Sequence, residues 1–107
     1  MGKKDVLEIL RRFRVALESK RIHVQKMILF GSWARGTAGQ YSDIDVVIIS
    51  SDFAGKDLWA RAQMLGGAAA ANHILEPLQP LALTPQEWDG KTSTICELAK
   101  DGEVVAV

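Results

Sequence analysis

The stretch of sequence that decides the fold reads LFGSWARG at residues 29–36 and, after a polar loop through Ser42, DIDVV at residues 43–47. A contiguous apolar run enters it, and this run predicts a mostly buried strand over residues 24–30. Gly31-Ser32 ends that strand abruptly. The next three residues predict a single helical turn, which Gly36 stops.

The second half of the stretch predicts another strand. Ile44 and the run Val46–Ile49 are β-branched, which is typical of a central strand covered on both faces. Apolar spacing and capping signals predict helices in the flanking sequence, over residues 5–20, 57–65 and 92–100. After Gly66-Gly67, residues 68–71 either extend the second of these helices or form a loop. A short helical turn is predicted to start at Thr84-Pro85-Gln86-Glu87. The segment 74–83 contains Pro77 and Pro80 and is predicted as an edge strand or an interrupted strand. Residues 103–107 are predicted as a final short strand. We therefore expect an α/β (α+β) fold, a small mixed sheet with flanking helices, in one domain over residues 1–107.

Composition narrows the class of protein. The 107 residues carry 13 Lys and Arg against 13 Asp and Glu, yet residues 1–40 hold nine basic and three acidic groups, so the charge is polarised along the chain. No apolar run approaches the roughly 20 residues of a membrane span. The single cysteine, Cys96, excludes an internal disulfide and is typical of a reducing compartment. We expect a cytoplasmic protein without a membrane partner.

Two aspartates stand where the second strand begins. Asp43 and Asp45 project from the same side of a strand, with Cα atoms roughly 6.5–7 Å apart, so their carboxylates can converge on a metal ion. Mg²⁺ suits such a pair because it takes few carboxylates and leaves positions for phosphate oxygens. The alternative is that Asp43 only caps a turn and Asp45 faces solvent.

Gly31-Ser32 adds a second element of a phosphate site. A glycine after a buried strand allows close approach of the backbone to a ligand, and the following turn presents free N–H groups. A P-loop is excluded because Thr37 stands at the position of its lysine, and a dinucleotide fingerprint is excluded because the second glycine is missing. An EF-hand is excluded because apolar residues follow Asp45.

The whole stretch resembles the signature G-S-x10-D-x-D of the DNA polymerase beta superfamily of nucleotidyltransferases, since Gly31-Ser32 is followed after ten residues by Asp43-Ile44-Asp45. It also resembles the minimal nucleotidyltransferase (MNT) branch of this superfamily, through residues 30–36 and Ser42-Asp43. The resemblance implies transfer of a nucleoside monophosphate from an NTP with release of pyrophosphate. It implies that Gly31 and Ser32 hold the phosphates and that Asp43 and Asp45 bind Mg²⁺. It also implies a frequent setting as the antitoxin of a HEPN-family toxin.

The family's third carboxylate, on a later strand, has no direct counterpart. Gln79 stands at the position judged equivalent, and the nearest acid is Glu76, which we assign as a catalytic residue and metal ligand if the prolines shift the register. The competing interpretation is an exposed glutamate of the edge strand. Arg35 is a candidate for neutralising phosphate charge and Ser42 for contacting nucleotide. The three tryptophans, Trp33, Trp59 and Trp88, are expected in the core, and the alternative for Trp33 is stacking on a nucleotide base.

Two functions from different classes fit this pattern. The first is an ATP-using, Mg²⁺-dependent enzyme that adenylylates a hydroxyl of a partner protein, because a chain of this size has no separate domain to recruit an acceptor. Direct binding of nucleic acid is not expected. The second is a catalytically degenerate binding protein that neutralises its partner by complex formation, and the missing third carboxylate favours it.

Overall fold

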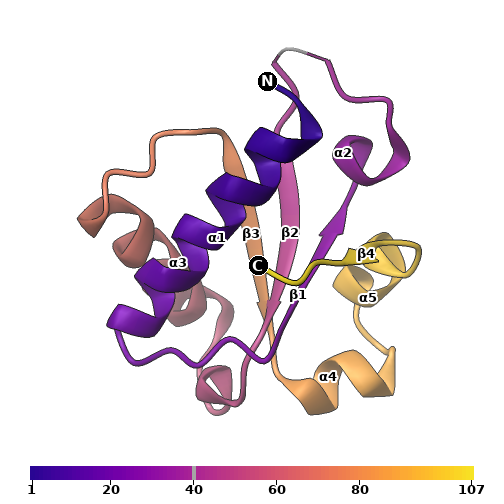
Figure 1. The fold of residues 1–107 in the computed structure, drawn as a ribbon. Helices are drawn as coiled ribbons and strands as arrows, with labels where there is room; N and C mark the ends of the chain where they lie inside the picture. The colour runs from indigo at the N-terminus through magenta and orange to yellow at the C-terminus, as the bar shows by residue number, and fades with distance from the viewer. Residues whose placement is uncertain (40) are drawn as a thin grey trace.

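The computed structural model describes residues 1–39 and 41–107; Gln40, within the predicted polar loop, lies outside the described residues. The described chain forms helices and strands in the order expected from the sequence (Figure 1). Their bounds are α1 Lys3–Ser19, β1 Lys26–Phe30, α2 Ser32–Arg35, β2 Ile44–Ile49, the 3-10 helix η1 Ser51–Phe53, α3 Leu58–Ala71, β3 Leu78–Leu83, α4 Pro85–Gly90, α5 Thr94–Ala99 and β4 Glu103–Val104.

The described strands form a mixed four-stranded sheet in the order β3-β2-β1-β4. β1 is antiparallel to β2 and β4, whereas β2 and β3 are parallel. The expected fold class, a small mixed sheet with flanking helices, is confirmed. β3 lies at an edge as predicted, which explains how Pro80 is tolerated, because an edge strand has only one neighbour that needs its N–H groups.

Two apolar cores cover opposite faces of the sheet. Alternation along β2 sends Ile44, Val46 and Ile48 to one face and Val47 and Ile49 to the other. The first face packs against α1 and α3, and Figure 1 shows α1 crossing the sheet with α3 beside it. The second face packs against α5 and, through Trp88, against α4. A central strand covered on both sides must be apolar almost throughout, which is what its sequence indicated.

The buried face of α3 differs from the predicted one. The buried residues of α3 are Arg61, Leu65 and Ala68, while Trp59 is 72% exposed. The expectation that Trp59 belongs to the core was wrong, because it lies two positions, about 200° around the helix, from Arg61. The helix also continues through Gly66-Gly67 to Ala71, since packing on the sheet and on α1 outweighs the cost of glycine in a helix, about 1 kcal/mol each.

Arg61 instead connects three parts of the chain. Its guanidinium donates to Glu87 (2.7 and 3.2 Å), to the Lys56 carbonyl (2.9 Å) and to the Ala82 carbonyl (3.3 Å). Glu87 also accepts a hydrogen bond from the Thr84 N–H, and Thr84 Oγ1 accepts from the Glu87 N–H. The capping box predicted at Thr84 is therefore confirmed, and it is tied to α3 through Arg61.

The C-terminal segment pairs within the chain. β4 lies antiparallel to β1, the Val105 N–H donates to the Met27 carbonyl (3.0 Å), and Arg14 donates to the Val107 carbonyl. The predicted strand over residues 103–107 is thus a two-residue strand followed by an apolar tail that packs on the sheet. Among the described residues, no helix combines the length and apolar character that crossing a membrane requires.

Candidate functional site

The two halves of the G-S-x10-D-x-D motif meet at one end of the sheet. β1 ends there and leads into α2, whereas β2 and β3 begin there (Figure 1). Phe30, the last residue of β1, pairs with Asp45, and Asp45 pairs on its other side with Gln79. Antiparallel pairing of β1 with β2 therefore places Gly31, which directly follows Phe30, beside the second aspartate.

Gly31 adopts a conformation reserved for glycine. Its φ is +72° and its ψ is −153°, a region that side chains essentially exclude. A Cβ atom at this position would also lie 3.1 Å from Asp45 Cγ and would overlap the carboxylate oxygen. Two independent constraints therefore require glycine at position 31: its positive φ and the close approach of the Asp45 side chain.

The turn after Gly31 matches the predicted short helix. The N–H groups of Ala34 and Arg35 donate to the Gly31 carbonyl (3.2 and 3.1 Å), and Gly36 ends the helix in the left-handed conformation. Ser32 is half-buried, and its hydroxyl makes no hydrogen bond within the described part of the chain. Ser32 and Trp33 are the first two residues of the helix, and their N–H groups have no acceptor in a preceding turn, so these two groups and the Ser32 hydroxyl are free to donate to a ligand.

Asp43 and Asp45 differ in environment. Asp43 is exposed just before β2, and Asp45 is half-buried within β2. Burial raises the pKa of Asp45, the negative charge of Asp43 raises it further, and the positive charge of Arg35 partly opposes both effects. The carboxylate pair is therefore electrostatically unfavourable on its own and is suited to a cation.

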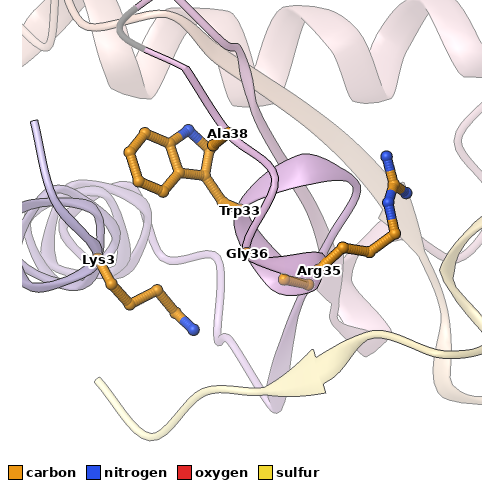
Figure 2. Close-up of a pocket in the computed structure, with 6 residues that line it drawn as sticks. Lys3, Trp33, Arg35, Gly36 and Ala38 are labelled. Atoms are coloured by element: carbon orange, nitrogen blue, oxygen red, sulfur yellow. The ribbon is translucent and has the colours of Figure 1, made fainter.

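Arg35 and Trp33 lie on different sides of α2. Figure 2 shows Trp33 and Lys3 on one side of the short helix and the Arg35 side chain extending away from both. An open pocket of about 290 Å³ lies here, lined by Lys3, Trp33, Ala34, Arg35, Gly36 and Ala38. Neither aspartate lines it, so this pocket adjoins the carboxylate pair without containing it. Arg35 lines this pocket, and its positive charge also partly opposes the rise in the pKa of Asp45, so it interacts with both the pocket and the carboxylate pair.

Ser42 braces the loop between the motif halves. Its Oγ accepts a hydrogen bond from the Gly39 N–H (2.8 Å), and its carbonyl accepts one from Trp33 Nε1 (3.4 Å). Trp33 is buried, as expected, and links α2 to this loop. The structure thus places Ser42 directly before Asp43, with its side-chain oxygen engaged within the loop.

Glu76 forms no metal-holding group with the two aspartates in the described part of the chain. Its Oε2 accepts a hydrogen bond from Arg12 of α1 (3.0 Å), whereas its Oε1 is buried without a hydrogen-bond partner among the described residues. In residues 1–39 and 41–107, no group of three His, Cys, Asp or Glu side chains is placed to hold a metal ion. The residue beside Asp45 is Gln79 instead. This pairing agrees with the sequence analysis, which judged position 79 equivalent to that of the family's third carboxylate.

Comparison with known proteins identifies the family. The chain matches the family model of the nucleotidyltransferase domain over residues 10–80. Because this match spans more than half of its length, the chain belongs to the nucleotidyltransferase domain family. No curated protein matches the sequence.

Two solved structures share the fold. A protein described as a nucleotidyltransferase from Sulfolobus solfataricus is 19% identical, with a TM-score of 0.71, over 95% of this chain and 80% of the other. A chain of a toxin-antitoxin structure with AMP-PNP is 21% identical, with a TM-score of 0.55, over 97% of this chain and 72% of the other. At these identities the similarity establishes the architecture.

Proposed function

We propose that the chain is a Mg²⁺-dependent nucleotidyltransferase that transfers AMP from ATP to a hydroxyl group of a partner protein. The observation that carries this proposal is the contact between Gly31 and Asp45, because it joins a phosphate-binding turn and a carboxylate pair in one site. Membership of the nucleotidyltransferase family supports the reaction class. Family membership does not specify the nucleotide, the metal ion or the acceptor, and the proposal assigns them as ATP, Mg²⁺ and a partner protein.

The carboxylate pair fits a divalent cation. Burial and mutual repulsion raise the pKa of Asp45, and a cation shared by Asp43 and Asp45 would relieve both effects. Mg²⁺ accepts a few carboxylates and leaves positions for phosphate oxygens. When bound, it would supply neutralisation of the charge on the transferred phosphoryl group.

The remaining residues bind and orient the nucleotide. The Ser32 hydroxyl and the main chain at Gly31-Ser32 donate hydrogen bonds to phosphate oxygens, and Arg35 contributes a positive charge that already reaches Asp45. Ser42 holds the loop that presents Asp43. In the transfer, the acceptor oxygen forms a bond to the α-phosphorus and the bond from that phosphorus to the bridging oxygen breaks. Pyrophosphate leaves with the bridging electron pair, and the hydroxyl proton passes to solvent.

A macromolecular acceptor fits the exposure of the site. Asp43 and Gln79 are exposed at the end of the sheet, so a side chain presented by another protein can approach them. The similarity of fold to a chain of a toxin-antitoxin structure supports such a partner. We infer that the chain belongs to the MNT branch and acts as the antitoxin of a HEPN-family toxin.

The test combines the chain with its candidate toxin, ATP and Mg²⁺. Intact-mass spectrometry should show the toxin gaining about 329 Da for each AMP, the mass of AMP minus water. The matched control is the double variant Asp43→Asn/Asp45→Asn, which should add no mass. If the pair forms a complex and ATP binds while the toxin stays unmodified, the enzyme proposal fails.

That outcome would favour the second function, a binding protein that neutralises its partner by occupying it. One observation favours this alternative: Gln79, a residue without charge, stands beside Asp45 where a third carboxylate would complete the site. Release of the toxin's activity by mutations in the interface alone, with the aspartates intact, would distinguish it.

A further inference from the structure

Gln79 lies beside Asp45 and has no role in the reaction proposed above. It pairs with Asp45 in the parallel register of β2 and β3. Two residues further along each strand, Val47 pairs with Leu81, and both belong to the apolar cluster on the second face of the sheet. Because side chains alternate along strands, Gln79 and Asp45 share that same face.

The position of Gln79 relative to Asp45 is held by the backbone around it. The Ile44 N–H donates to the Pro77 carbonyl (2.8 Å), which fixes the start of the register. The Leu78 N–H donates to the Glu76 carbonyl (2.7 Å), and Pro80 restricts the backbone after Gln79. Neighbouring strands lie about 4.8 Å apart, so the Gln79 amide is within side-chain reach of a cation held by Asp45.

The chemistry of the amide distinguishes this neighbour from an acid. A glutamine carbonyl is an oxygen ligand for hard divalent cations, but it contributes no charge. Asp43 and Asp45 together supply two negative charges, enough to balance one divalent cation. In residues 1–39 and 41–107 no third acidic side chain is grouped with them to hold a metal ion, and Glu76 pairs through Oε2 with Arg12.

We propose that Gln79 is the third protein ligand of this site and that its neutrality limits the site to one divalent cation. This inference rests on the proposed function, since it concerns the cation that the aspartates would bind. It goes beyond that function by assigning a new residue and a metal stoichiometry.

The test measures Mn²⁺ binding by electron paramagnetic resonance in the presence of α,β-methylene-ATP, whose α–β bond cannot be cleaved in the transfer. With the nucleotide bound, the wild-type chain should hold one Mn²⁺ in total, shared by the carboxylate pair and the phosphates, and two bound ions would overturn the proposed stoichiometry. Gln79→Asp should bind Mn²⁺ at least tenfold more tightly or take up one additional ion, and Gln79→Ala should bind at least threefold more weakly.

The matched control is Gln86→Asp, which adds the same charge at an exposed position of α4, beyond the opposite end of β3. It should leave Mn²⁺ affinity and stoichiometry unchanged. Gln79 is exposed, so its variants should fold, and circular dichroism confirms this before titration. Wild-type binding that Gln79→Asp and Gln79→Ala leave unchanged would overturn this inference alone. Absence of Mn²⁺ binding in the wild type would overturn the proposed function and this inference with it.

Discussion

Gly31 lies against the carboxylate of Asp45, with so little space between them that a Cβ atom on Gly31 would overlap that carboxylate. The two residues are fourteen positions apart in sequence and meet because β1 and β2 are antiparallel. Any change in the turn at Gly31 therefore moves a carboxylate of the candidate metal site.

Gly31→Ala should disrupt both stability and binding. The new side chain would meet a disfavoured backbone angle and the Asp45 carboxylate, which together should lower the free energy of unfolding by about 2–4 kcal/mol. Affinity for ATP with Mg²⁺ should fall at least tenfold because Asp45 must rotate away. Urea unfolding and titration calorimetry measure the two effects.

Gly55→Ala is the matched control for this variant. Gly55 has a similar φ, +75°, but nothing lies within 4 Å of its added Cβ. We expect a loss of about 1 kcal/mol and unchanged nucleotide binding. Equal effects of the two substitutions on binding would show that Asp45 does not depend on Gly31.

Asp45→Asn should stabilise the metal-free chain and abolish metal-dependent ATP binding. Burial and the charge of Asp43 disfavour the ionised form of Asp45, so a neutral amide removes a destabilising charge. In the presence of EDTA, the midpoint of thermal unfolding should rise by about 2–5 °C. Adding ATP and Mg²⁺ should raise the midpoint of the wild type only. A variant that is still stabilised by the nucleotide would remove Asp45 from the site.

Arg61→Ala should cost about 2–4 kcal/mol of folding free energy, because it leaves two backbone carbonyls and the Glu87 carboxylate without their donor. Urea unfolding measures the loss. Lys100→Ala, which removes an exposed ion pair with Glu97, is the control and should change stability by less than about 0.5 kcal/mol. If the two variants were equally stable, Arg61 would not connect α3 with α4 as described.

The stability of the chain should depend on pH through Glu87. Hydrogen bonds from Arg61, and then from Thr84, lower the pKa of Glu87 below its ordinary 4.5. The ionised form is therefore favoured in the folded chain. This contribution is complete above pH 4.5 and is lost as the pH falls through the lowered pKa. Glu87→Gln should thus be less stable than the wild type at neutral pH, and the difference should shrink on acidification. A difference that stays constant with pH would contradict this assignment, and Glu97→Gln serves as the exposed control.

Glu76→Gln should act on stability and not on metal binding. The substitution removes a partly exposed ion pair with Arg12, so a loss below about 1 kcal/mol is expected. Titration of ATP and Mg²⁺ should give the wild-type affinity. A tenfold loss of that affinity would return Glu76 to the set of metal ligands.

Local sequence was sufficient wherever a local signal determines the structure. The β-branched run in β2 indicated burial on both faces, and Thr84 with Glu87 indicated the capping box that the structure contains. Gly31 and Gly36 marked the limits of a helix of a single turn. In the capping box and the single turn, neighbouring residues supply both the conformational preference and the hydrogen-bond partners. In β2 they supply only the preference, because its hydrogen-bond partners lie on β1 and β3.

The tertiary structure decided which residues from distant segments of the chain lie side by side. Trp59 and Arg61 share one helix, and only the packing of α3 on the sheet buries the charged residue and exposes the aromatic one. Glu76 and Gln79 stand three positions apart, and only the parallel register of β3 with β2 puts Gln79 beside Asp45 while Glu76 meets Arg12. The sequence by itself therefore determined the motif, the order of elements and the fold class. The neighbours of each site residue were decided by strand pairing and packing, whose energies depend on contacts between residues far apart in the chain.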